Sequence, residues 1–140
     1  MYQVLLDTNI LVAAMRSQLG ASYRLLSQLG DGRSRPNLTV AVALEYEAVL
    51  KRNCGEFGLM EADIDDALDT ICSVAGLHRL YFLWRPLAAD PDDDLVLEAA
   101  IASHSDFIVT FNKRDFPDCG RFGILCLTPR EFLILIERLP

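Results

Sequence analysis

The chain has 140 residues, of which 51% are hydrophobic and 24% are charged, so it can bury one core and is not a disordered chain. Its 13 Lys and Arg against 20 Asp and Glu give a formal net charge of −7, which excludes a strongly basic surface for gripping nucleic acid. If so acidic a protein works on RNA or DNA, it must bring in positive charge, for example as metal ions.

Short apolar runs alternate with helical patterns along the chain. The expected strands are 2–6, 38–40, 107–111 and 123–127, with a further extended segment at 78–84. The expected helices are 10–16, 21–29, 42–52, 61–75, 92–103 and 129–139, the last of them opened by a capping box from Thr128 to Glu131. This alternation predicts an α/β fold with a parallel sheet covered on both faces, and ligands bind such sheets beyond the carboxyl ends of the strands.

Targeting and redox signals are absent from the sequence. Asp7 interrupts the only early apolar run, so no signal peptide is expected, and no apolar stretch reaches the roughly 18 residues that cross a bilayer. None of the four cysteines lies in a C-x-x-C pair, which argues against a zinc ribbon or a thioredoxin-like site. We expect a single domain over residues 1–140, located in the cytoplasm and without membrane contact.

Four acidic residues that are distant in sequence map to one edge of the expected sheet. Asp7 follows the first strand, Glu45 lies about one turn into a helix after the second, Asp94 opens the helix before the fourth strand, and Asp115 follows that strand. Carboxylates gathered in one cleft repel one another, and a hard divalent cation relieves that repulsion. Oxygen ligands without paired His or Cys favour Mg²⁺ or Mn²⁺ over zinc. Such an ion suits phosphodiester hydrolysis.

Asp7 and Glu45 each have a simpler structural explanation. Asp7 can cap the following helix, although Thr8 can do so equally well. Glu45 shares the apolar face of its helix, where a carboxylate is costly unless it is satisfied, whereas Glu47 lies about 200° round the helix and faces solvent. We therefore favour Glu45 over Glu47.

The other two positions leave similar alternatives. Asp94 belongs to the run 92–94, in which helix capping explains one aspartate and not three. The helical period places Asp94 on the packed side, and Asp93 remains an alternative because the register of the run is ambiguous. Asn112 and Asp115 follow the most hydrophobic strand, where a turn with a helix cap explains them equally well.

The motifs that carry these residues occur in a recognisable order over nearly the whole chain. They are Val4-Leu5-Leu6-Asp7-Thr8-Asn9, the segment 43–50 around Glu45, Asp90-Pro91-Asp92-Asp93-Asp94, Val109-Thr110-Phe111-Asn112-Lys113-Arg114-Asp115-Phe116, and Leu127-Thr128-Pro129-Arg130-Glu131-Phe132-Leu133. Together they resemble the PIN-domain family of metal-dependent ribonucleases. The final segment resembles a bacterial subgroup of toxins from toxin–antitoxin pairs.

The resemblance implies a fold and a site. The fold is a Rossmann-like three-layer α/β/α sandwich with a central parallel sheet. One or two Mg²⁺ or Mn²⁺ ions would be held by four carboxylates, with Asp7 and Asp94 as direct ligands and Asp115 and Glu45 holding a second ion or its waters. The residues with supporting roles are Thr8 and Asn9, which would orient the first carboxylate and its loop; Asp93, as the alternative ligand; and Asn112, which stands where many members have Asp.

The resemblance also implies partners. RNA would be the substrate, and the side chains of Lys113, Arg114 and Arg16 are candidates for contacts with its phosphates. A cognate antitoxin with a basic C-terminal segment would lie over the acidic site, and a homodimer is expected. The helices 21–29 and 61–75 offer either an apolar groove or ordinary core packing. The alternatives are a non-catalytic PIN-like module that binds RNA or protein, and a PIN nuclease outside any toxin–antitoxin system.

Overall fold

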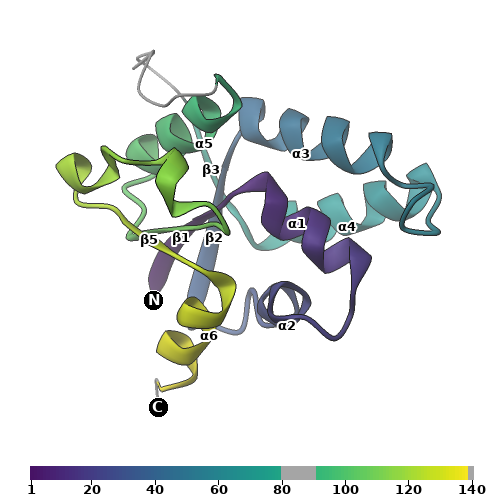
Figure 1. Ribbon diagram of the computed structural model, residues 1–140, viewed down its shortest axis with the longest axis horizontal. Coiled ribbons are helices and arrows are strands. Elements are labelled where there is room, and N and C mark those ends of the chain that lie inside the picture. Colours follow the sequence, from purple (N-terminus) through teal and green to yellow (C-terminus); the bar gives the residue numbers. More distant parts are fainter. Residues whose placement is uncertain (80–90, 139–140) are drawn as a thin grey trace.

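The computed structural model describes residues 1–79 and 91–138, and of residues 91–93 it describes the backbone alone. Its five strands form one parallel sheet in the order β3-β2-β1-β4-β5 (Figure 1). The strands are β1 Tyr2–Leu6, β2 Ser34–Thr39, β3 Gly76–His78, β4 Phe107–Val109 and β5 Leu125–Leu127. The helices are α1 Thr8–Arg16, α2 Ala21–Ser27, α3 Val40–Arg52, α4 Glu61–Val74, α5 Pro91–Ala102 and α6 Pro129–Glu137, with short 3₁₀ turns at Lys113–Asp115 and Cys119–Phe122.

The predicted three-layer α/β/α arrangement is confirmed. Helix α5 packs against β1, β2 and β4, while α1 packs against α2 and α3 in the layer on the other side of the strands (Figure 1). The central strand β1 lies between these layers, and Val4, Leu5 and Leu6 are buried almost completely. Because both faces of β1 are covered, its apolar run needs no alternation. No described helix has the length and apolar character needed to cross a membrane.

The second strand differs most from the prediction. An apolar run at 38–40 was expected, whereas β2 begins at Ser34 and includes Pro36 and Asn37. Strand β3 pairs with β2 only from Asn37 onward, so Pro36, which lacks an N–H, has a strand neighbour on the β1 side alone. The buried Asn37 amide donates to Gln3 Oε1 at 3.1 Å and its oxygen lies 2.8 Å from His78 Nε2. Hydrogen bonding therefore allows a polar strand inside the sheet.

The other predicted helices and strands are present, with ends that move by one or two residues. Helix α3 starts at Val40 because the Thr39 hydroxyl accepts the Val42 N–H at 3.2 Å and caps it. The capping box of Thr128 and Glu131 is confirmed at the start of α6. Of the extended segment expected at 78–84, the first residue ends β3 and 80–84 lie outside the described residues.

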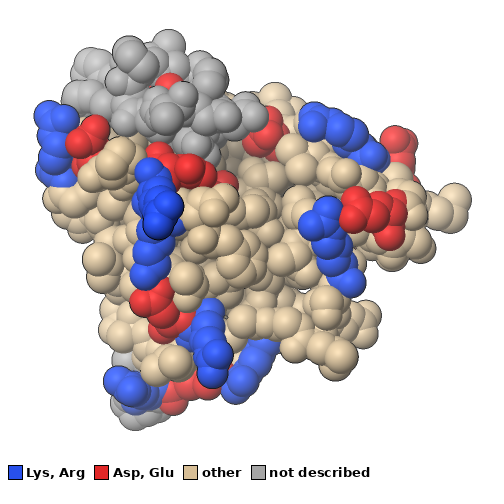
Figure 2. All heavy atoms as spheres, viewed as in Figure 1, with Lys and Arg blue, Asp and Glu red and all other residues tan. Residues whose placement is uncertain are grey.

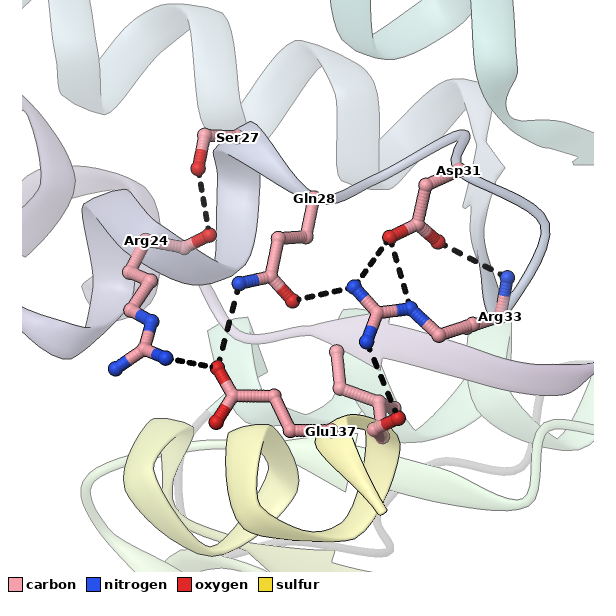
Figure 3. A network of polar contacts seen from close by, with 7 residues as sticks. Arg24, Ser27, Gln28, Asp31, Arg33 and Glu137 are labelled. Atoms are coloured by element: carbon pink, nitrogen blue, oxygen red, sulfur yellow. Dashed lines mark hydrogen bonds and ion pairs between the residues drawn. The ribbon is translucent and has the colours of Figure 1, made fainter. Parts of the chain in front are cut away.

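A polar cluster joins the carboxyl ends of α2 and α6 (Figure 3). The Arg33 guanidinium forms an ion pair with Asp31 at 2.6 Å and donates to Gln28 Oε1 at 2.9 Å and to the Ile136 carbonyl at 3.3 Å. Glu137 in turn accepts a hydrogen bond from the Gln28 amide at 3.4 Å. The last carbonyls of a helix lack partners within the helix, so Arg33 both caps α6 and fixes it to the turn after α2.

Tyr46 connects α3 to the end of the central strand. Its ring is 1% exposed, and its hydroxyl donates to the Leu6 carbonyl. Burial raises the pKa of this phenol, and the charge of Asp7 raises it further, so the hydroxyl stays a donor. The backbone just before Asp7 is thereby held from the helix layer.

We expect Tyr46→Phe to lower the free energy of unfolding by about 1–2 kcal/mol, because the buried hydroxyl would be lost and the Leu6 carbonyl would lose a donor. Urea unfolding measures this change. The matched control is Tyr23→Phe, since Tyr23 is 41% exposed, and its change should lie within about 0.5 kcal/mol of zero. Equal effects of the two substitutions would contradict the role given to Tyr46.

Candidate active site

The adjacent strands β1 and β4 deliver two side chains to the same point at their carboxyl ends. Leu6 pairs with Val109, so the next residues, Asp7 and Thr110, lie side by side. The Thr110 hydroxyl donates to Asp7 Oδ2 at 2.7 Å, and the two residues are 0% and 7% exposed, respectively. Asp7 occupies the N-cap position of α1, yet its side chain makes no capping hydrogen bond. The Thr110 bond directs its carboxylate to the strand ends, so helix capping alone does not account for its placement.

The surroundings of the Asp7 carboxyl disfavour its charged form. Burial raises its pKa above the ordinary value, and the negative charge of Asp115 adds to the rise. Hydrogen bonds from the Thr110 hydroxyl and the Thr8 backbone N–H act in the opposite direction. Asp115 is thus close enough to oppose the ionisation of Asp7, and a cation placed between them would favour the charged form of Asp7.

The other two predicted carboxylates come from the helices α3 and α5, which pack against each other. Asp94 is 4% exposed, as the packed side of its helix predicted, and Glu45 is half-buried. Both engage in polar or electrostatic interactions. The Glu47 side chain is 45% exposed and forms an ion pair with Lys51 at 3.6 Å. The choice of Glu45 over Glu47 stays a prediction. The side chain of Asp93, the alternative to Asp94, lies outside the described residues.

Sequence reasoning missed two residues here. Thr110 received no role, although it lies in the motif quoted after β4 and is the hydrogen-bond donor to Asp7. Glu98 also received none, yet it is fully buried one turn after Asp94 on α5. The available signal was the position of Glu98, four residues after Asp94 and within the apolar part of α5.

Of the predicted supporting residues, Asn9 offers a side-chain oxygen, whereas Thr8 and Asn112 act through their backbone N–H groups. Asn9 has a buried side-chain oxygen that accepts no hydrogen bond from any described residue, so it could take a ligand or a water. Thr8 contributes its backbone N–H to Asp7. Asn112 is exposed and uses its backbone N–H, which donates to the Thr110 hydroxyl at 3.0 Å.

The candidate site residues have the ligand chemistry that a hard cation needs, but the side chains that the structure describes are not grouped around one point. Carboxylates and an amide oxygen without hydrogen-bond partner are the donors that Mg²⁺ and Mn²⁺ prefer. Within residues 1–79 and 91–138, however, no three His, Cys, Asp or Glu side chains are grouped so that they could hold an ion. The structure therefore brings Asp7 and Asp115 into electrostatic contact without assembling the whole expected set.

Two of the three predicted phosphate-binding cations already have partners. Arg16 forms an ion pair with Glu56 at 2.9 Å, and Lys113 with Glu131 at 2.6 Å. The Lys113 ammonium is the main cause that lowers the pKa of Glu131 to about 2. Arg114 is exposed and has no partner in the part of the chain that the structure describes. Basic and acidic side chains lie next to one another over the face in Figure 2, with no broad basic patch.

The profile of the PIN domain matches residues 3–114. The chain belongs to the PIN-domain family. The match includes Asp7, Glu45 and Asp94 and ends one residue before Asp115. PIN domains are nucleases, so the family supports a hydrolase that acts on nucleic acid.

Solved structures give the same fold. A chain in the crystal structure of VapBC2 from Rickettsia felis bound to a DNA fragment from their promoter is similar, with a TM-score of 0.60. The alignment covers 90% of the present chain and 98% of that chain at 17% sequence identity. At this identity the similarity is evidence for a shared PIN fold. No curated protein matches the chain.

Replacing Thr110 by Val should raise the pKa of Asp7 further, because the hydroxyl that favours the charged carboxylate is removed. Carbon-detected NMR titration of the Asp7 carboxyl in metal-free buffer measures this shift. Thr110→Ser keeps the hydroxyl and is the matched control. An unchanged pKa in the Val variant would show that the hydrogen bond does not control this group.

The raised pKa also predicts how stability depends on pH. The folded state holds the Asp7 proton more tightly than the unfolded state, so its stabilising contribution is complete below the unfolded pKa and is lost as the pH rises through the folded one. Asp7→Asn removes this loss. In EDTA we expect a higher Tm than wild type at pH 7, with a gain that shrinks towards pH 4, measured by calorimetry. A gain independent of pH would refute the linkage.

Proposed function

We propose that the protein is a metal-dependent endoribonuclease and the toxin component of a toxin–antitoxin pair. The observation that carries the nuclease part is the buried Asp7 carboxylate at the end of the central strand, held by Thr110 beside the charge of Asp115. Burying an acid in this way costs stability, and a cation site offsets that cost.

In this proposal each site residue has a task. Asp7, Asp94, Asp115 and Glu45 would hold one or two Mg²⁺ or Mn²⁺ ions, which when bound supply Lewis-acid chemistry for orienting the phosphodiester and activating water. Thr110 fixes the direction of the Asp7 oxygens and favours their charge. The buried Asn9 oxygen, which accepts no hydrogen bond from any described residue, is available as a further acceptor.

Substrate contacts would come from the loop after β4. Arg114 is the predicted cation without a partner among the described residues, so it can contact a phosphate without breaking an ion pair, unlike Lys113 and Arg16. RNA as the substrate is supported by the resemblance to the ribonucleases of the family.

The partner is proposed on two grounds. The similar structure from Rickettsia felis is a VapBC2 assembly, and the net charge of −7 suits a basic antitoxin segment. An apolar hollow of about 240 Å³ lies between α1, α2 and α4, and residues such as Met15, Tyr23, Leu26 and Ile71 line it. This hollow could receive a partner helix. A homodimer and a cytoplasmic location belong to the same proposal.

We expect cleavage of single-stranded RNA in Mg²⁺ or Mn²⁺ and none in EDTA. Asp7→Asn, Asp94→Asn and Asp115→Asn should each lower kcat/KM by about 100-fold or more, since even outer partners of metal ligands contribute about 10- to 100-fold. Gel assays of labelled RNA measure the rate.

Two glutamates on α3 provide a matched pair. Glu45→Gln should lower the rate, whereas Glu47→Gln removes only a surface ion pair and should leave it unchanged. Cleavage that persists in EDTA and in Asp7→Asn would come from a contaminant and would refute the nuclease proposal.

The rival function is a non-catalytic PIN-like module that binds RNA or protein. It is favoured by one observation, namely that no three acidic side chains in the described ranges are grouped for an ion. Isothermal titration with Mn²⁺ separates the two functions. Binding that is lost in Asp7→Asn and Asp115→Asn supports the nuclease, and RNA binding that ignores both metal and these substitutions supports the rival.

A further inference from the structure

Phe111 is an exposed aromatic at the edge of the candidate site. With 48% of its surface open to solvent, it is the most exposed phenylalanine among the described residues, although Ile108, Val109 and Thr110 before it are buried. The cause is local, because the Thr110 hydroxyl accepts the Asn112 N–H at 3.0 Å and closes a turn. Residue 111 lies at the corner of this turn, where its ring cannot join the core.

The same turn fixes Phe111 relative to the acidic site. The Thr110 hydroxyl that closes the turn also donates to Asp7 Oδ2 at 2.7 Å, so the aromatic residue adjoins the residue that touches this carboxylate. Phe111, Arg114 and Asp115 line one hollow of about 500 Å³. An aromatic ring, a cation and an acid therefore share one opening.

This combination fits an unpaired nucleotide. A base stacks on an aromatic ring whatever its sequence, and a guanidinium contacts the neighbouring phosphate. Lys113 is engaged with Glu131, which leaves Arg114 as the available cation beside the ring. The Arg114 guanidinium attracts a phosphate, so the opening offers one contact for a base and one for the backbone of the same strand. A base in a duplex is stacked on its neighbours and cannot present its face to the ring.

We propose that Phe111 is a stacking platform that positions one unpaired base of the substrate next to the acidic site. This inference rests on the proposed nuclease function and adds one residue that positions the substrate. It assigns Phe111 a role in positioning the substrate, and the reaction itself remains with the acidic residues.

Binding without cleavage tests the platform directly. The probe is a short fluorescein-labelled single-stranded RNA, and its anisotropy is measured with the Asp7→Asn chain in Mg²⁺. Adding Phe111→Ala should weaken binding by about 5- to 100-fold, the range found when one stacking aromatic is removed. Phe111→Trp should retain binding, and Phe111→Leu, which is apolar but has no π face, should lose it. Leu125→Ala is the control, because Leu125 is an exposed apolar residue at the start of β5, away from the carboxyl ends of the strands, and it should change nothing.

Two further measurements distinguish a stacking role of Phe111 from a structural one: a scan of the RNA with abasic nucleotides and the steady-state kinetics. Replacing successive nucleotides by abasic ones should weaken binding at one position for the Phe111 chain and at none for Phe111→Ala. In the chain that retains Asp7, Phe111→Ala should raise KM for single-stranded RNA more than it lowers kcat, and its Tm should stay unchanged.

The outcomes separate this inference from the proposed function. Equal affinity of the Phe111 and Phe111→Ala chains overturns the platform even if RNA is cleaved. Full binding by Phe111→Leu overturns it as well and indicates an apolar protein contact. Binding that depends on Phe111 without any cleavage by the wild-type chain supports the platform and refutes the nuclease. A chain that neither binds nor cleaves refutes both.

Discussion

The arrangement of this protein depends on one buried carboxylate. Asp7 ends the central strand, where parallel strands on both sides and helices on both faces exclude water. Its charge is tolerated because Thr110 from β4 donates to it and because Tyr46 from α3 holds the carbonyl just before it. Three elements distant in sequence therefore meet at a single acid, and their packing sets its direction.

This acid lies at a point where folding and function make opposite demands. Folding favours a neutral group, since burial and the nearby Asp115 both oppose ionisation. Metal binding needs the charged group. The protein keeps hydrogen-bond donors at this point, and helices α3 and α5, which carry Glu45 and Asp94, pack against each other. Under the proposed function, part of the net charge of −7 would belong to the site and would be offset by metal ions.

The sequence predicts the parts of the fold that follow from hydrophobic pattern. An apolar run before Asp7 defines a strand covered on both faces, and the helical period correctly places Asp94 on a packed side. The polar first half of strand β2 was not predicted. Pro36 can lie in this strand because β3 is short and pairs with β2 only from Asn37 onward, and this depends on strand pairing rather than on composition. The role of Thr110 depends on which strand lies beside β1, and no local pattern encodes that.

Charge partners were equally hard to predict. Lys113 and Arg16 look like phosphate-binding cations in the sequence, yet each meets a glutamate that is far away along the chain. Ion pairs of this kind depend on where two long side chains end in space, which hydrophobic periodicity does not determine. Arg114 has no such partner among the described residues and remains available.

Glu131 connects the last helix to the loop after β4. One of its oxygens accepts the Thr128 N–H at the start of α6 and also pairs with Lys113, beside the loop that carries Asp115. The last helix is in turn tied to α2 through Arg33. The family match stops at residue 114, but Glu131 in the segment after it pairs with Lys113 in the loop that carries Asp115. The segment that the family model matches is therefore shorter than the set of elements that pack together, because α6 packs against α2 and β5.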